Sequence, residues 1–439
     1  MTTNRSVLRW VGAASVLLLG LAWFAALPTP RAAALFSQAL SVSASGYDSY
    51  APRVAYDREG DATLVWVRES QEYPHPMRVQ MRSRSHDGVW SSTLTLSPSD
   101  QAPRLPKVAV DDDGDAVVVW DAFNGAEYGV YARGVSRTGT LGPVLALSAT
   151  GVTIHGTDVA VDSDGDAVVT WAEWHSDGSV YPMMRRFSRS GSLSAATVLS
   201  SSPARAEPPA VAFDREGDAL LAWANDNVVQ ARTLSASGTL GGLKMVSGRV
   251  SPIDRHFTAK VTVDRDGDAL VTWLHWTAAD QSTQVIGRWV SRDGTVGVVH
   301  QLTPGSHPDL VNYSVAGDLD GDVMLTWDRF YNGYLYGRQI SRTGTIEQAV
   351  LLTRYGRLHT VAVDDDGDGV VVYQGQGING SVGSVRVRRV TPSGALGPEQ
   401  VVASIGVSPT TAVTPTGGAL IAWERRFQVD LRIQASIGP

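Results

Sequence analysis

A thirteen-residue phrase that occurs eight times constrains this chain more than any other feature. It is clearest at 108–120, where it reads Val-Ala-Val-Asp-Asp-Asp-Gly-Asp-Ala-Val-Val-Val-Trp. The other copies run at 54–66, 159–171, 211–223, 261–273, 315–327, 361–373 and 411–423. Each copy closes on an aromatic residue, and successive closing aromatics lie 46 to 54 residues apart. A repeat of this length indicates one supersecondary unit copied eight times and stacked into a single body.

Each unit reads as four β-strands. In the second unit, an alternating run at 107–110 ends at the acidic turn, and a nearly continuous apolar run follows at 116–122. Asn124-Gly125 then supplies the positive-φ residues that a hairpin turn needs. Residues 128–136 and 141–148 predict the third and fourth strands. No segment beyond the first 34 residues keeps a 3.6-residue apolar period, so the predicted class is all-β.

The apolar second strand determines how the units must be arranged. Residues 116–120 point apolar side chains to both faces of the sheet, so both faces need cover. Neighbouring sheets packed face to face supply that cover, and a closed ring leaves no sheet uncovered. The sequence therefore predicts one domain over residues 35–439, an eight-bladed β-propeller of four-stranded antiparallel blades.

The two ends of this domain predict how the ring closes. The last unit has strands near 410–413, 419–423 and 429–435 but lacks a fourth, whereas residues 35–43 read as a spare fourth strand. We expect the N-terminal strand to complete the eighth blade. This closure resembles that of WD-repeat propellers, and the resemblance implies that the first strand of each blade lines a central channel.

Residues 1–34 read as an export leader. Arg5 and Arg9 precede an apolar run at 11–27, and Ala32-Ala33-Ala34 offers small residues for cleavage. The alternative is an uncleaved anchor, for which this 17-residue run is at the short end. We expect a signal peptide and a secreted or extracytoplasmic protein. The chain has no cysteine, so its stability cannot depend on disulfides.

The charge of the chain limits its partners. The formal net charge is −7, and removal of the three arginines of the leader would make it more acidic still. An acidic protein of this kind is not expected to bind nucleic acid. A membrane partner is expected only if the leader stays attached, and we expect a monomer.

The acidic turn of the phrase is a candidate calcium site. Five units carry Asp-x-Asp-Gly-Asp and two carry Asp-x-Glu-Gly-Asp, a clustering of carboxylates that suits calcium. The alternative is a tight hairpin in which aspartate caps its own backbone and glycine takes a positive φ. The eighth unit, at 414–418, keeps the glycines without any acid, which favours the hairpin. We therefore expect no cofactor, and the calcium candidates are Asp111, Asp113, Asp115, Asp162, Asp164 and Asp166.

Arginines recur in the turn between the third and fourth strands, which should lie on the same face as the acidic turns. They are Arg137, Arg189, Arg292 and Arg342. We expect them to pair with the acidic turns within or between blades, each exposed pair contributing about 0–1 kcal/mol.

The phrase resembles two known propeller repeats. Its acidic turn before an aromatic is similar to the Asp-box of sialidases, and Ala109, Asp111, Gly114 and Trp120 resemble the tryptophan-docking repeat of quinoprotein dehydrogenases. Both resemblances imply the propeller fold and suggest a secreted bacterial-type repeat protein. The chain has neither the Arg-Ile-Pro segment of sialidases nor the adjacent cysteines common near the quinoprotein cofactor.

The opposite face, formed by the 2–3 loops and the blade-to-blade loops, varies in length and chemistry. We call it the varied face, and function tends to reside on such loops. Aromatic and polar residues interleave there, which suits a glycan or protein ligand. The candidate ligand-binding residues are Tyr73, His75, Trp174, His175, His275, Trp276, Phe330 and Tyr331. The repeated tryptophan itself is assigned to the core because it ends an apolar strand.

No catalytic motif is present, so no catalytic residue is assigned. The expected function is an exported, non-catalytic scaffold that binds a protein or glycan through the varied face. One alternative is an extracellular polysaccharide hydrolase or lyase that uses two carboxylates among Glu72, Glu173, Asp226 and Asp328. Another is a passive structural module of the cell surface.

Overall fold

The computed structural model describes residues 36–189, 191–200, 206–225, 227–251, 253–305, 310–329, 333–376 and 383–439, without the side chain of Val311. The predicted leader lies outside these residues. Residues 35–439 form one compact unit. Within the described ranges every regular element is a β-strand. None of the described residues therefore form a helix with the length and apolarity that crossing a bilayer requires.

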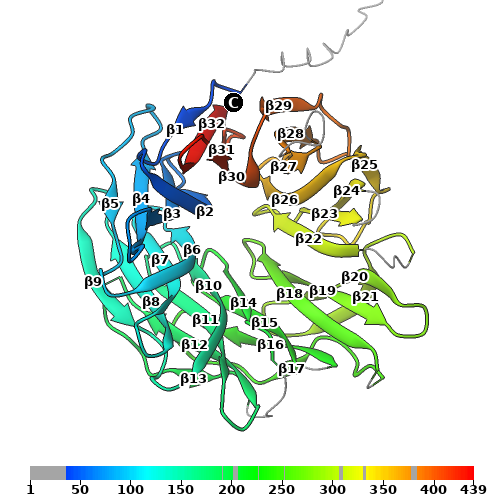
Figure 1. The fold of residues 1–439 in the computed structure, drawn as a ribbon. Coiled ribbons are helices and arrows are strands. Elements are labelled where there is room, and N and C mark those ends of the chain that lie inside the picture. Colours follow the sequence, from blue (N-terminus) through cyan, green and yellow to red (C-terminus); the bar gives the residue numbers. More distant parts are fainter. Residues whose placement is uncertain are drawn as a thin grey trace, which may run out of the picture. The chain divides into compact units, whose positions relative to one another are not determined.

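Thirty-two strands form eight four-stranded antiparallel sheets arranged in a ring (Figure 1). Blade 1 contains β2 (Tyr47–Tyr56), β3 (Ala62–Ser70), β4 (Met77–Arg84) and β5 (Leu94–Thr95), and blade 2 contains β6 (Ala102–Val110), β7 (Ala116–Phe123), β8 (Tyr128–Val135) and β9 (Leu141–Ala146). Blade 3 contains β10 (Thr153–Val161), β11 (Ala167–Trp174), β12 (Val180–Phe187) and β13 (Thr197–Val198), and blade 4 contains β14 (Ala210–Phe213), β15 (Ala219–Asn225), β16 (Val228–Leu234) and β17 (Lys244–Met245). Blade 5 contains β18 (Arg255–Val263), β19 (Ala269–Thr277), β20 (Ser282–Val290) and β21 (Val296–Gln301), and blade 6 contains β22 (Leu310–Gly317), β23 (Val323–Arg329), β24 (Leu335–Ile340) and β25 (Val350–Thr353). Blade 7 contains β26 (Gly356–Val363), β27 (Gly369–Gly375), β28 (Ser384–Val390) and β29 (Gln400–Ala403), and blade 8 contains β30 (Val407–Val413), β31 (Ala419–Arg426), β32 (Leu431–Gly438) and β1 (Leu40–Ser41).

The predicted closure of the ring is confirmed. β1 pairs antiparallel with β32, with Leu40 opposite Ala435 and Ser41 opposite Gln434. Hydrogen bonds extend this contact on both sides, because Ser37 N–H donates to Ile437 O at 2.7 Å and Val42 N–H donates to Ile433 O at 2.8 Å. The eighth blade is therefore built from both ends of the described chain.

The core lies between the blades. All eight closing aromatics, including Tyr373 in blade 7, are at most 1 % exposed. Trp171 packs among valines of blade 2, and Trp66 packs among residues of blade 8, so each blade covers its neighbour. The assignment of these aromatics to the core is confirmed.

The acidic turns make a repeated contact between blades. Asp111 Oδ1 accepts the N–H groups of Asp113 and Asp115 at 3.0 and 2.8 Å, which closes the hairpin. Its other oxygen faces the glycine of the next turn: a Cβ at Gly165 would lie 2.8 Å from Asp111 Oδ2. The same contact recurs at six further junctions around the ring. In blade 8, Thr414 Oγ1 replaces the aspartate and accepts Gly418 N–H at 2.9 Å.

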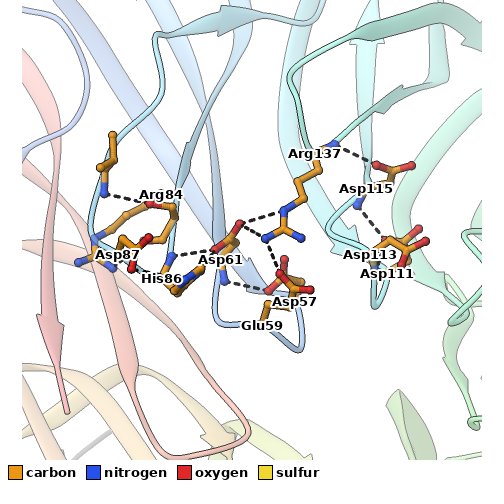
Figure 2. Close-up of polar contacts among 12 residues, drawn as sticks. Asp57, Glu59, Asp61, Arg84, His86, Asp87, Asp111, Asp113, Asp115 and Arg137 are labelled. Carbon is orange, nitrogen blue, oxygen red and sulfur yellow. Dashed lines mark hydrogen bonds and ion pairs between the residues drawn. The ribbon is translucent and has the colours of Figure 1, made fainter.

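Four of these junctions carry the predicted arginine pairs, and every one joins two blades. Figure 2 shows Arg137 of blade 2 beside the acidic turn of blade 1, with its Nη2 2.8 Å from Asp61 Oδ2 and 2.5 Å from Glu59 Oε2. Arg189, Arg292 and Arg342 reach the turns of blades 2, 4 and 5 in the same way. Blade 1 has His86 in the arginine position, and its ring nitrogen bonds Asp61 of its own blade.

The inner strands depart from the prediction. The first strand of blade 2 begins at Ala102 and not at Lys107, because a β-bulge between Arg104 and Lys107 interrupts the alternation. Seven of the eight inner strands carry such a register shift. A bulge bends the strand and re-aims its side chains. These bulges position the site described next.

Candidate functional site

The bulged inner strands surround the centre of the ring (Figure 1). In six blades one bulge residue has a positive φ: Ala51, Leu105, Gly156, Thr258, Leu358 and Ser408. Backbone strain of this kind persists only where neighbouring structure holds it, and it gathers at functional sites. Side chains flanking the bulges of blades 2 and 3 meet residues from the second strands and from blade 4. We call Arg104, Asp121, His155, Trp174 and Glu207 the blade 2–4 cluster.

Blade 2 contributes an ion pair. Arg104 Nε and Nη2 donate to Asp121 Oδ2 at 3.2 and 2.9 Å. The guanidinium also lies over the Tyr128 ring, 4.2 Å from its centroid. Burial raises the pKa of the Asp121 carboxyl, while Arg104 and His155 act in the opposite direction. The pair therefore presents a half-exposed guanidinium above a buried carboxylate.

Blade 3 contributes an aromatic platform. Trp174, the last residue of β11, is 47 % exposed and stacks with the exposed His155 ring at a centroid distance of 6.2 Å. The buried Glu173 accepts the Trp171 indole N–H at 2.8 Å and lies 3.7 Å from His175 Nε2. The Trp171 contact anchors Glu173, the neighbour of Trp174 in β11.

Blade 4 contributes a second carboxylate. A Cβ at Gly156 would lie 2.5 Å from Pro208, so the β10 bulge packs closely against the segment that carries Glu207. Glu207 Oε2 accepts the N–H of Thr258, in the β18 bulge, at 2.5 Å. Burial raises the pKa of this carboxyl, and the Thr258 N–H and His155 lower it. His155 is thus within electrostatic range of Asp121 and Glu207.

The cluster brings together the elements of a small-molecule site. It offers one exposed indole face, an exposed imidazole, a guanidinium and two carboxylates with raised pKa values. A few placed polar groups beside an aromatic surface are typical of ligand sites. Raised carboxyl pKa values are also common among acid–base groups.

The other predicted ligand-binding residues do not join this cluster. Tyr73 is 91 % exposed in blade 1 and lies edge-on to His75, whose backbone N–H bonds Glu72 O at 2.7 Å. His175, the residue after Trp174, packs edge-on against Tyr181. Phe330 and Tyr331 lie outside the described residues, as does Asp226.

His275 and Trp276 are not loop residues, contrary to the prediction. Both belong to β19, because the β19–β20 hairpin extends as far as Thr277 and Ser282. His275 pairs with His256 of β18, and the two rings lie 4.9 Å apart. Burial lowers the pKa of His256 to about 4 and also lowers the pKa of His275. Both imidazoles are therefore uncharged near neutral pH.

A second buried titratable pair lies between blades 6 and 7. Asp328 Oδ2 is 3.8 Å from His359 Nδ1, and both side chains are almost fully buried. Burial raises the pKa of Asp328 to about 6 and lowers that of His359 to about 4. Among the proposed hydrolytic carboxylates, Asp328 is thus buried against His359, Glu173 is buried against the Trp171 indole, and Glu72 is exposed.

The calcium candidates take part in the turn contacts. Asp111 and Asp162 each use Oδ1 to accept two backbone N–H groups. Asp113 and Asp115 pair with Arg189 of the next blade. Asp164 and Asp166 donate backbone N–H groups to Asp162. Within the described residues no three His, Asp or Glu side chains are grouped so as to hold a metal ion.

Two comparisons find no counterpart for this chain: no family model matches it, and no curated protein matches it. Solved structures share its fold. One structure from a study of two prolyl endopeptidases is 12 % identical with a TM-score of 0.51 and covers 87 % of this chain, which spans 55 % of that protein. A Dyadobacter fermentans protein of unknown function is 10 % identical with a TM-score of 0.47, covering 90 % of this chain and 99 % of its own. A Hadza microbial sialidase is 10 % identical with a TM-score of 0.43, covering 92 % and 96 %. At this identity the likeness is one of fold, that of a distant β-propeller.

Proposed function

We propose that this chain is an exported, non-catalytic propeller that binds a glycan through the blade 2–4 cluster. The observation that carries the proposal is the exposed Trp174 ring, stacked on His155 and flanked by polar groups from two neighbouring blades. An exposed indole face suits the apolar face of a sugar ring. Arg104 and Glu207 can then donate to and accept from its hydroxyl groups.

A glycan fits this cluster better than a protein partner does. The cluster is small, polar and centred on one aromatic residue, whereas stable protein interfaces are larger and contain several desolvated anchors. Export, which the leader predicts, would place the propeller where polysaccharides and glycoproteins are found.

The test is a glycan array on the purified protein followed by calorimetric titration of the hits. Trp174→Ala should weaken the affinity by about tenfold or more, or about 1.4 kcal/mol. Tyr73→Ala is the control, because Tyr73 is an exposed aromatic residue of the varied face that lies outside the cluster. Unchanged binding by Trp174→Ala, or an equal loss in the control, would refute this location.

A polysaccharide hydrolase is the second candidate, because Asp121 and Glu207 both have raised carboxyl pKa values and flank His155. Every glycan that binds should therefore be incubated with the protein and analysed for cleavage. Cleavage that is abolished by Glu207→Gln would replace the binding function with hydrolysis. Binding without cleavage supports the scaffold.

A further inference from the structure

The inner strands bring one register position of every blade together around the centre of the ring. In each blade this position pairs with the residue just before the buried aromatic of the second strand. We call these residues the inner layer; they are Arg53, Lys107, Asp158, Ala210, Lys260, Ser314, Thr360 and Thr410. The inner layer therefore sets three cationic side chains and three hydroxyl groups against a single carboxylate.

Lysine is otherwise almost absent from the chain. Of its three lysines, Lys107 and Lys260 belong to the inner layer, and Lys244 lies in β17, the outer strand of blade 4. The two inner lysines come from blades 2 and 5.

The charge of Lys107 is balanced, but that of Lys260 is not. Lys107 Nζ lies 2.8 Å from Asp158 Oδ1, and Asp158 Oδ2 accepts Val211 N–H at 3.2 Å. Lys260 Nζ donates to Tyr313 O at 2.9 Å and lies 4.9 Å from the Tyr313 ring centroid. No carboxylate of the described residues forms an ion pair with this ammonium group, which leaves donors without an anionic partner.

The surroundings of Lys260 are electropositive. Burial and, to a smaller extent, Lys107 lower its pKa to about 8, against the opposing effect of Asp158. Lys260 in turn helps to lower the pKa of the buried His359. Thr360, the inner-layer residue of blade 7, follows His359 in the chain. Its hydroxyl group has no hydrogen-bond partner among the described residues.

The nearby carboxylates are already engaged. Glu424 accepts Ala51 N–H at 2.9 Å and lies within electrostatic range of Arg53. Glu207 accepts Thr258 N–H. Neither supplies a counter-charge to Lys260 in an ion pair.

We propose that Lys260, together with Lys107, binds a small oxyanion at the centre of the ring. The ligand class is a carboxylate, phosphate or sulfate group, whose oxygens would accept the ammonium donors of Lys260 that have no anionic partner. The Lys107 side chain is 39 % exposed, so solutes in solution reach this lysine. The proposal uses other residues than the blade 2–4 cluster and does not rest on glycan binding.

The first experiment uses the unmodified protein and its three lysines. Lysine acetylation is followed residue by residue by mass spectrometry in sodium sulfate, phosphate or acetate, against sodium chloride of equal ionic strength. At about ten times Kd, the oxyanions should slow acetylation of Lys260 and Lys107 by about tenfold. Lys244 is the internal control and should not change. Equal effects on all three lysines, or no effect on Lys260, would overturn the proposal.

Two further arms identify the source of the oxyanion. Protection by glucuronic acid at lower concentration than acetate, with none by glucose, would indicate a carboxylate carried on a sugar. Equal protection by glucuronic acid and acetate would indicate a free oxyanion. Both results support the site, whereas protection by glucose would contradict it.

The pH dependence provides a readout that depends on Lys260 itself. As pH rises through about 8, Lys260 loses its proton, so the rise in Tm caused by sulfate should shrink between pH 7 and pH 9. Sulfate keeps its charge over this range. Sulfate also stabilises proteins in general by exclusion from their surface, so the effect of the site is the part that a Lys260 substitution removes. Lys260→Met should therefore reduce the rise in Tm and remove its pH dependence, and Lys244→Met should change neither. Lys260→Arg should retain the larger rise and lose its pH dependence, because arginine stays charged. A rise in Tm as large and as pH-dependent in Lys260→Met as in the unmodified protein would refute the assignment.

Discussion

The glycine of each acidic turn is held by two separate constraints. Gly165 has a φ of +85°, a conformation that side chains disfavour, and a Cβ there would also lie 2.8 Å from the buried Asp111 Oδ2 of the preceding blade. Gly191, in the 3–4 turn of the same blade, has a φ of +84° with open space around it. A comparison of the two glycines therefore separates the cost of a positive φ from the cost of close approach between blades.

We predict that Gly165→Ala is clearly more destabilising than Gly191→Ala. Both changes should cost about 1–2 kcal/mol for the positive φ. Gly165→Ala should lose about 1–3 kcal/mol more, because its methyl group must displace Asp111 or Arg189. Urea denaturation measures the difference in the free energy of unfolding. Equal losses would mean that the turns of neighbouring blades do not pack as described.

On the face that carries the acidic turns, neighbouring blades are joined in two alternative ways. Where the next blade supplies an arginine, the facing position of the third strand is Ser83, Gly134, Thr233 or Trp289. At the three other junctions between acidic turns, this position is Arg186, Gln339 or Arg389, and each side chain donates to a backbone carbonyl of the next blade. Each of these seven junctions therefore has, at one of these two positions, a polar side chain that spans the two blades.

The smaller residues leave space beneath the arginines. A hollow of about 230 Å³ is lined by Gly134, Asp111 and Arg189, and one of about 270 Å³ by Thr233, Asp214 and Arg292. The two hollows occupy equivalent junctions, between blades 2 and 3 and between blades 4 and 5.

The two arrangements should be interchangeable. Arg186→Ala removes a 2.8 Å hydrogen bond to Ala236 O and should cost about 1–2 kcal/mol. Adding Ala236→Arg places an arginine where the other junctions have one, within reach of the acidic turn of blade 3, and should restore most of the loss. Guanidinium denaturation would mask ion pairs, so urea at low salt is the appropriate measurement. A double variant no more stable than Arg186→Ala would contradict the equivalence.

The regular strands followed from the sequence because alternation and turn chemistry are local. The predicted bounds of the second and third strands of blade 2 agree with β7 and β8 to within one residue. The bulges could not be predicted, because the positive φ of Leu105 and the packing of Gly156 against Pro208 depend on contacts between blades. For the same reason the sequence does not predict that β19 continues through His275 and Trp276.

The candidate site was predicted only in part. The sequence predicts Trp174 as an aromatic residue of a varied loop, and the structure places it at the end of β11, whereas the sequence assigns Asp121 only to an apolar strand. A carboxylate directly after the closing aromatic, as in Asp121, Asp328 and Glu424, is the signal that could have located it. Glu207 carries no such signal, since only the ring brings it beside His155.

At the scale of the whole molecule, stability depends on the eighth blade. Deleting residues 36–43 removes β1 and its hydrogen bonds to β32, and uncovers a long strand edge. We predict a marked fall in Tm, together with self-association that light scattering detects. A synthetic peptide of residues 36–43 added in trans should restore Tm. If the deletion left Tm unchanged, closure by β1 would be unnecessary to the ring.

Closure also sets an order of events during synthesis. Ser43 Oγ accepts the Ile433 N–H across 390 residues, whereas blades 1 to 7 each use one continuous stretch of chain. Those seven can form one after another as the polypeptide is made. The segment synthesised first must wait, unpaired, for the segment synthesised last. A chain halted before residue 431 would therefore hold seven finished blades and an open circle, leaving the earliest strand available to proteases or to another chain's edge.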